Sequence, residues 1–473
     1  MIATLERCPW NPARAFLGRL AICVALAPFL LVSPAAAQPE PSTPSWQQEY
    51  WARIDRRDWD AAIASAEQLV VAARPASAAT GLRLSEALSL LGSAQLNKGE
   101  LVAAEAAFGE SMQLAEQYGG RSSAALVDPL RGLGYTLAAA GRHDQAIPYM
   151  DRALLISRRT AGLFDVSQQG LLRQLATSLT AVGAPAEAER HMIYLRRVGE
   201  QAYGKDDPRQ IAVLSNVGDW YAEVGQMDMA RQNYRAAIAI ADRKLGKTSL
   251  GVVDPLRSFA ASYTREVVLS YYGIVSSTDQ TSTFDPSANV SGEPMNPRFL
   301  SSEGERALAR ALKVAQTDPE TSLQTIVGTL IQMGDWFVMK LQPDKAMPYY
   351  EQAAQRLAKA GPEEADAMLG AALGFPVQVY YPTPPLATRN LHRAPGETED
   401  HFVQIEFTVQ PDSTVTDVRV TDQAANDRQA SQVVEAMRAA RYRPKFVDGK
   451  PVVTPAVSYR QVFKVRKETK AAE

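Results

Sequence analysis

The chain has 473 residues, a formal net charge of −2 and 46% hydrophobic residues. This length allows two or three domains with sizeable cores, and the ordinary apolar content excludes global disorder. The near-balance of charges gives no support for general nucleic-acid binding, so we expect no nucleic-acid partner.

Residues 1–37 have the pattern of a secretory signal peptide. Three arginines precede an apolar run at residues 20–32, and the small residues Ala35-Ala36-Ala37 follow. We expect cleavage after Ala37 and a soluble periplasmic product. The alternative is an uncleaved inner-membrane anchor, and only then would the protein contact the membrane. The run is shorter than the roughly 20 residues of a comfortable span, and no later stretch is apolar enough to cross a bilayer.

Few side chains of the mature chain are suited to metal or redox chemistry. Both cysteines, Cys8 and Cys23, lie in the segment expected to be removed, which excludes disulfides and thiolate ligands from the product. The four histidines are scattered and form no set with metal-ligand or triad spacing. We therefore predict a non-enzymatic protein with no cofactor, no catalytic residue and no metal site.

After a polar, Pro-rich lead-in at residues 38–45, an alanine recurs every 42 residues. The five positions are Ala62, Ala104, Ala146, Ala188 and Ala230. Such a period predicts stacked pairs of helices. A small residue in each first helix, for close helix approach, and a glycine at its end, for a left-handed cap, recur with the alanines. The small residues are Gly92, Gly134, Ala176 and Gly218, and the cap glycines are Gly99, Gly141, Gly183 and Gly225.

These residues, with an aromatic or methionine four positions after the alanine, resemble the tetratricopeptide repeat (TPR). The longer period resembles the kinesin-light-chain type of repeat. The resemblance implies an α-solenoid at residues 46–361, a right-handed superhelix whose inner face comes from the first helix of each pair.

The period breaks once, because the alanine due at position 272 is Tyr272. Residues 275–299 are rich in Ser, Thr, Asp and Pro, which predicts an irregular insert. The insert is either a decorated loop at a binding surface or a neutral surface expansion, and loops tolerate insertion readily. Helical patterns resume at Glu303, and a last clear unit surrounds Met333-Gly334 and Ala346.

Helical spacing puts two positions of each first helix on the inner face. The candidate peptide-binding residues at these positions are Arg131, Tyr135, Arg173, Asp219 and Arg257. Arginine at three of five equivalent places could hold the carboxylates of an extended peptide. In the alternative interpretation the arginines are solvated and pair locally with acids such as Asp128 or Asp254.

Residues 362–400 form a Pro-rich connector, for which we predict an extended, non-helical course from Phe375. Residues 401–467 then read as strand, strand, helix and strand, a small α+β unit. Alternating apolar and polar residues at Val403–Val409 predict the first strand, and apolar residues at helical spacing in 427–440 predict the helix. Asp448-Gly449 predicts a turn before the last strand. Residues 468–473 form a tail.

This stretch is similar to the C-terminal domain of the TonB family of energy transducers. The residues that carry the resemblance include Tyr381, Pro382, Tyr442, Pro444, Gly449 and Phe463. The resemblance implies a periplasmic domain whose sheet edge pairs with a segment of an outer-membrane transporter. Addition of a strand to a sheet edge is a general recognition mode.

The sequence therefore predicts a periplasmic scaffold for protein–protein interaction. Its repeats would bind a protein or peptide, and its TonB-like domain would bind a strand of an outer-membrane transporter or envelope protein. Two alternatives stay open. One is a membrane-anchored, TonB-like energy transducer, and the other is an envelope assembly or accessory factor that acts through the repeats alone.

Overall fold

The structure is a computed structural model that describes residues 45–74, 77, 80–271, 295–360, 372–388 and 398–467. The predicted signal peptide, nearly all of the lead-in, most of the insert and the tail lie outside the described residues. The described chain forms two compact units, residues 45–205 and residues 206–467.

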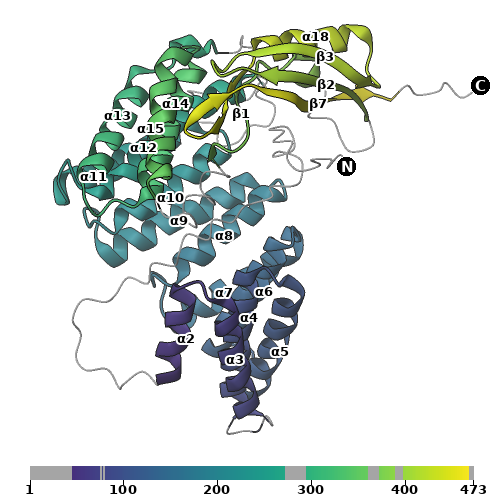
Figure 1. Cartoon of the computed structure of the whole chain (residues 1–473). Helices are drawn as coiled ribbons and strands as arrows, with labels where there is room; N and C mark the ends of the chain where they lie inside the picture. Colours follow the sequence, from purple (N-terminus) through teal and green to yellow (C-terminus); the bar gives the residue numbers. More distant parts are fainter. Residues whose placement is uncertain are drawn as a thin grey trace, which may run out of the picture. The chain divides into compact units, whose positions relative to one another are not determined.

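The unit of residues 45–205 consists of helices that pack pairwise in chain order (Figure 1). The α-helices are α2 (Ser45–Asp55), α3 (Trp59–Ala73), α4 (Gly81–Lys98), α5 (Leu101–Gly119), α6 (Val127–Ala139), α7 (His143–Thr160), α8 (Gln168–Ala181) and α9 (Pro185–Tyr203). A short 3-10 turn, η1 (Ala124–Leu126), precedes α6.

The unit of residues 206–467 begins with three more helix pairs and ends in a sheet domain. Its long helices are α10 (Gln210–Glu223), α11 (Met227–Lys244), α12 (Val253–Ser270), α13 (Ser302–Thr317), α14 (Leu323–Met339) and α15 (Pro343–Ala358). The 3-10 turns η2 (Leu250–Val252) and η3 (Pro297–Phe299) precede α12 and α13.

Small residues on the first helix of a pair receive a large side chain from the second helix. A Cβ added to Gly134 would lie 2.3 Å from Met150, and one added to Gly218 would lie 2.6 Å from the ring of Tyr234. The predicted close approach is confirmed at these positions. Turn glycines follow the first helices, and the predicted left-handed conformation is also confirmed: φ is +90° at Gly99 and +76° at Gly141.

The break in the 42-residue period falls between α12 and α13. Helix α13 packs against α12, so the insertion separates the two helices of one pair. Gly304 in α13 stands 42 residues before Ala346 and replaces the alanine. The absence of a side chain at Gly304 leaves room for Trp336, since an added Cβ would lie 2.2 Å from that ring. The 42-residue spacing therefore resumes after the insertion, with glycine in the place of the alanine.

The sheet domain contains a three-stranded antiparallel sheet in the order β3-β2-β7, formed by β2 (Thr398–Val409), β3 (Val415–Gln423) and β7 (Thr454–Arg466). The predicted order of strand, strand, helix and strand matches β2, β3, α18 (Asp427–Ala439) and β7. Two small pairs were not predicted: β1 (Val377–Tyr380) with β4 (Arg441–Arg443), and β5 (Lys445–Val447) with β6 (Lys450–Val452).

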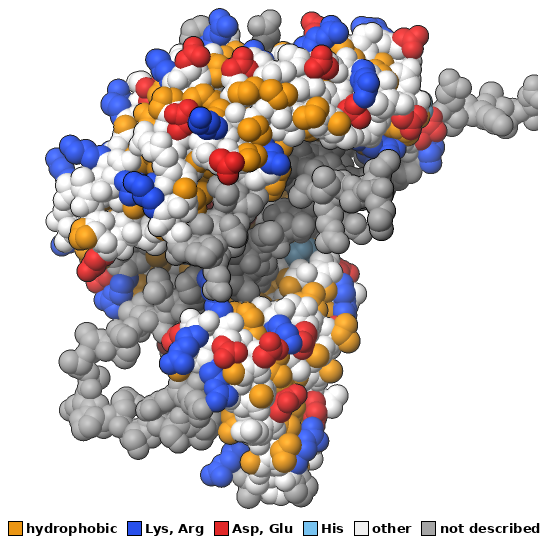
Figure 2. All heavy atoms as spheres, in the orientation of Figure 1, with side chains coloured by type: hydrophobic (Ala, Val, Ile, Leu, Met, Phe, Trp, Pro, Cys, Tyr) orange, Lys and Arg blue, Asp and Glu red, His pale blue; other side chains and the backbone are white. Residues whose placement is uncertain are grey.

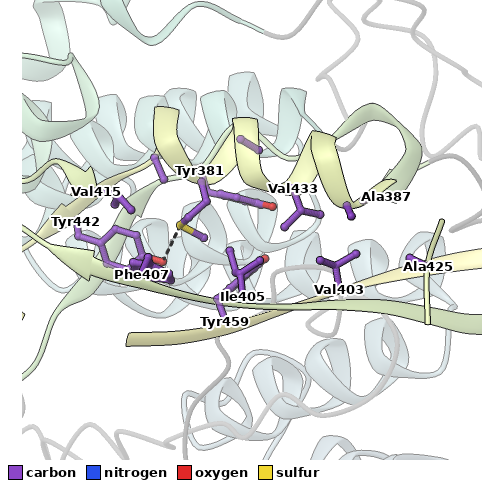
Figure 3. Close-up of a cluster of buried hydrophobic side chains, with 14 of the residues drawn as sticks. Tyr381, Ala387, Val403, Ile405, Phe407, Val415, Ala425, Val433, Tyr442 and Tyr459 are labelled. Carbon is purple, nitrogen blue, oxygen red and sulfur yellow. Dashed lines mark hydrogen bonds between the residues drawn. The ribbon is translucent and has the colours of Figure 1, made fainter. Parts of the chain in front are cut away.

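Helix α18 covers one face of this sheet, and the core lies between them (Figure 3). A capping box fixes the start of the helix, because Asn426 and Gln429 exchange side-chain and backbone hydrogen bonds. Val433 from the helix and Ile405 and Phe407 from β2 are almost fully buried between the two layers. The alternating apolar residues of β2 and the apolar residues at helical spacing in α18 therefore pack into the same hydrophobic core.

The connector is not wholly extended, contrary to the prediction. It contributes β1, which hydrogen-bonds to β4, and a single helical turn, α17 (Pro385–Thr388). Proline is compatible with the first turn of a helix, which explains why Pro385 can begin α17. Among the described residues, no helix has the length and apolarity needed to span a membrane.

Candidate binding surfaces

In residues 45–205, three predicted site residues lie near one another on first helices. Arg131 and Tyr135 belong to α6 and Arg173 to α8. Arg131 donates to Asp128 at 2.6 Å, the local pairing of the alternative interpretation. The Tyr135 hydroxyl is buried and has no hydrogen-bond partner among the described residues. Burial raises the pKa of Tyr135 to about 12, although the positive charges of Arg131 and Arg173 lower it.

In residues 206–467, the first helices α10, α12 and α14 enclose a groove of ≈ 600 Å³. We call it the α10–α12–α14 groove. The lining residues used below include Asp219, Asp254, Arg257, Ser258, Gln332 and Asp335. The structure thus places the predicted residues Asp219 and Arg257 in one concavity, with three acidic side chains and one basic side chain along it.

Arg257 is fixed on the floor of this groove. Its Nε donates to Oε1 of Gln332 at 3.0 Å, and the Gln332 amide donates back to the Arg257 carbonyl at 2.9 Å. Asp254 lies 3.5 Å from the guanidinium. Gly328 leaves the space for this side chain, because an added Cβ would stand 3.1 Å from Arg257 Nη2. Burial lowers the pKa of Arg257, while Asp254 opposes that effect.

Two aspartates of the groove are each held by a tyrosine of the following helix. Tyr234 donates to Asp219 Oδ1 at 2.7 Å, and Tyr350 donates to Asp335 Oδ1 at 2.7 Å. Burial, together with the aspartate charge, raises the pKa of both tyrosines. The hydroxyls therefore stay protonated and keep donating, which fixes the orientation of each carboxylate.

Asp335 also binds an arginine of the sheet domain. Arg443 in β4 donates from Nε to Oδ1 at 3.0 Å and from Nη2 to Oδ2 at 2.9 Å. Its Nη1 donates to the Ala372 carbonyl at 2.6 Å. Burial lowers the pKa of Arg443, but the Asp335 carboxylate more than offsets this, and the net pKa is raised.

Two aromatic contacts support the same junction. Phe446 packs edge-on to Tyr350 with ring centres 6.2 Å apart, and the Tyr271 and Tyr380 hydroxyls are 2.8 Å apart. Within this unit the sheet domain is therefore joined to the last repeats by specific polar and aromatic contacts.

The residues of the TonB-like motif lie in the interior and the turns of the sheet domain. Tyr442 is 4% exposed and Phe463 fully buried, while Pro444 is also buried and Pro382 half-buried. Tyr381 donates to the buried amide of Gln461 at 3.2 Å. Gly449, with φ +75°, closes the β5–β6 hairpin. These residues build the domain and do not themselves form an exposed surface.

Asp335, Gln332 and Arg443 were not among the residues predicted for the site. A signal for Asp335 was present, because Gly218-Asp219-Trp220 recurs as Gly334-Asp335-Trp336, each with a tyrosine 15 residues after the aspartate. Arg443 had no such signal, since its partner lies 108 residues away.

The described surface carries mixed charge. On the face shown in Figure 2, basic and acidic side chains are interspersed with hydrophobic ones. Within the described residues, no group of three or more His, Cys, Asp or Glu side chains is arranged to hold a metal ion.

Comparison with known families identifies the repeats. Residues 83–159 and 168–263 match the sequence model of the tetratricopeptide repeat. This part of the helical region therefore consists of TPR units, whose stacking creates extended concave surfaces for binding. The fold is a mainly helical, TPR-like solenoid with a small C-terminal sheet region. No curated protein sequence matches the chain significantly.

Several solved structures are distantly similar. BtubC (BKLC) from P. vanneervenii is 17% identical and covers 64% of this chain and 94% of its own, with a TM-score of 0.37. A putative kinesin light chain repeat protein from Podosopora anserina is 14% identical, covering 49% and 93%, with a TM-score of 0.36. The apo quorum sensor NprR from B. thuringiensis is 13% identical, covering 69% and 85%, with a TM-score of 0.40.

Proposed function

We propose that this protein is an exported interaction scaffold, in which the repeats bind a segment of a protein partner and the sheet domain binds a second, extended segment. The observation that carries the proposal is the α10–α12–α14 groove. Three successive first helices contribute polar side chains to one concavity, and two of its carboxylates are held in place by tyrosines. Oriented polar groups in a concave surface give a binding site its specificity.

The edge of β7 is the place where the sheet domain would accept a strand. Among the described residues β7 pairs only with β2, and their register is regular from Thr398↔Arg466 to Phe407↔Val457. The other edge strand, β3, has two register shifts and a positive φ at Asp417, features that weaken edge pairing. In β7 the one register shift and the positive φ at Ala456 lie near the start of the strand, before the regular part that begins at Val457. Strand addition at β7 agrees with the resemblance of this domain to the TonB family and with an outer-membrane or envelope partner.

The proposed compartment is the periplasm. It rests on the signal-peptide pattern of residues 1–37. Mass spectrometry of the protein recovered from the cell envelope tests this: a first residue of Gln38 supports a free periplasmic scaffold. Retention of residues 1–37 would instead favour the membrane-anchored, TonB-like transducer.

Site-specific photocrosslinking in cells tests the two binding surfaces separately. A photoreactive residue at Ser258, in the groove, should capture a partner, whereas one at the exposed Glu351 on α15 should not. On the sheet, Ser458 of β7 is compared with Thr421 of β3, both exposed. Equal capture at the groove and at Glu351 would contradict groove binding, and preferential capture at Thr421 would contradict the assignment of the β7 edge.

Removal of residues 375–473 separates the sheet domain from the repeats. Loss of the partner that crosslinks at Ser458, with retention of the partner that crosslinks at Ser258, is the expected result. If every partner is retained, the protein acts through its repeats alone, as an assembly or accessory factor would.

A further inference from the structure

Two repeats of the unit 206–467 contain the same aspartate–tyrosine arrangement. In each, a Gly-Asp-Trp tripeptide lies on the first helix and a tyrosine of the second helix donates to the aspartate at 2.7 Å. The glycine is required in both, because a Cβ would meet the tyrosine ring at 2.6 Å in one and 2.3 Å in the other. We call these arrangements the Asp219–Tyr234 pair and the Asp335–Tyr350 pair.

The molecule itself shows what the Asp335–Tyr350 pair binds. Arg443 reaches both carboxylate oxygens of Asp335 with two nitrogens of its guanidinium, at 3.0 and 2.9 Å. Such a two-pronged contact matches the planar guanidinium and not the single ammonium group of lysine. The arginine side chain is only 11% exposed in this position. An oriented aspartate beside a tyrosine is thus a docking point for arginine in this protein.

The Asp219–Tyr234 pair lies on the same groove, and Asp219 is exposed. Acidic side chains outnumber basic ones among the lining residues, with Asp219, Asp254 and Asp335 against Arg257, but Asp335 is already bound by Arg443 and Asp254 lies 3.5 Å from Arg257. Arg257 is engaged by Gln332 and Asp254 on the floor. Asp219 therefore places in this groove the same tyrosine-held carboxylate that Asp335 presents to Arg443.

We propose that Asp219, oriented by Tyr234, binds an arginine side chain of the partner segment in the α10–α12–α14 groove, as Asp335 binds Arg443. This inference rests on the proposed function, and it names the chemistry that the groove selects. The occupant is an extended segment of another protein that carries at least one arginine.

The test uses the full-length protein and a defined probe, a fluorescent peptide with the sequence of residues 439–446. The position of Arg441 carries citrulline, so that the equivalent of Arg443 is the single arginine of that segment. A second peptide carries citrulline at the Arg443 position as well, which removes the positive charge of that side chain and keeps its shape. Fluorescence anisotropy should show binding of the arginine peptide at least about 10-fold tighter than the citrulline peptide.

Two variants that each remove one negative charge from the groove distinguish arginine docking at Asp219 from a general electrostatic attraction. Asp219→Asn should lower affinity for the arginine peptide about 10-fold, while its amide oxygen still accepts the Tyr234 hydroxyl and preserves the fold. Asp254→Asn removes a charge from the same groove and should change affinity less than about 2-fold, as an exposed side chain usually does. Unchanged melting temperatures verify that both variants fold.

Equal losses in the two variants, equal affinity for the two peptides, or no binding of the arginine peptide at millimolar concentration would each overturn the inference. The proposed function is judged independently by crosslinking at Ser258. Capture that persists unchanged in Asp219→Asn would refute arginine docking and leave the scaffold intact, whereas absence of capture in the wild type would refute groove binding itself.

Discussion

The two helical units use one packing rule with different surface chemistry. In residues 45–205, Gly134 receives Met150, and the residue after the glycine is Tyr135 between two arginines. In residues 206–467, Gly218 receives Tyr234, and the residue after the glycine is Asp219. In both units the glycine and the large side chain that packs on it fix the spacing of the two helices. The residue after the glycine can therefore vary, and with it the charge of the surface. A solenoid can thus vary its binding chemistry without altering its core.

The shared packing rule gives the largest expected effect. Phe108 is 1% exposed and fits against Gly92 and Gly132, whose added Cβ atoms would lie 3.0 and 2.2 Å from its ring. Phe108→Ala should lower the free energy of unfolding of residues 45–205 by about 3–5 kcal/mol, through lost burial and a cavity.

Urea unfolding followed by circular dichroism measures this loss, and hydrogen exchange in α5 and α6 locates it. Leu155→Ala is the matched control, because Leu155 is 58% exposed on α7 and should change stability by less than about 1 kcal/mol. Similar effects of the two substitutions would contradict a stabilising role for the packing of Phe108 against Gly92 and Gly132.

The next largest effect on stability is expected from the contact between Arg443 and Asp335, which belongs to the second unit. Arg443→Gln removes the cation from Asp335, whose side chain is 29% exposed, and should destabilise the unit 206–467 by about 3 kcal/mol. Hydrogen exchange should increase in β1 and β4.

Arg441→Gln serves as the control on the same strand, since Arg441 donates to the carbonyls of residues 438–440 instead. If exchange in β1 and β4 rises equally in both variants, the Asp335 contact does not hold the sheet domain against the repeats.

Alkaline pH should act on Tyr135, whose hydroxyl is buried in the first unit. Burial raises the pKa of Tyr135 from 10.0 to about 12, so the folded state holds the proton more tightly. The resulting stability is present below pH 10 and is lost as the pH rises toward 12. Relative to Tyr135→Phe, the wild type should lose about 2–3 kcal/mol over this interval.

The measurement is urea unfolding of both proteins between pH 8 and pH 12. A difference between them that stays constant with pH would mean that the Tyr135 hydroxyl is solvated in the folded protein.

At neutral pH, removal of a hydroxyl should have different consequences in the two units. Tyr234→Phe removes the donor to Asp219 and should cost about 1 kcal/mol. Tyr135→Phe removes a buried hydroxyl that has no partner among the described residues, and should be neutral or slightly stabilising. Thermal unfolding of the two variants gives the comparison, and equal destabilisation would show that Tyr135 has a hydrogen-bond partner.

The candidate site could be predicted only in part. Helical spacing was enough to bring Asp219 and Arg257 to the inner surface, because side chains three and four apart share one helix face. It could not show that Arg257 lies on the groove floor, since that depends on Gly328 and Gln332 of a later repeat. Helical spacing also could not show that Arg173 and Arg257 belong to different compact units.

By itself, the sequence determined the repeat architecture, because the small residue, the turn glycine and the alanine act locally within each helix pair. Alternation in β2 and spacing in α18 likewise determined the order of the sheet domain. Tertiary structure alone decided that the insertion lies within one helix pair, that β1 pairs with β4, and that Arg443 reaches Asp335. Those contacts join residues far apart in the chain, and no local periodicity encodes which distant partner a side chain meets.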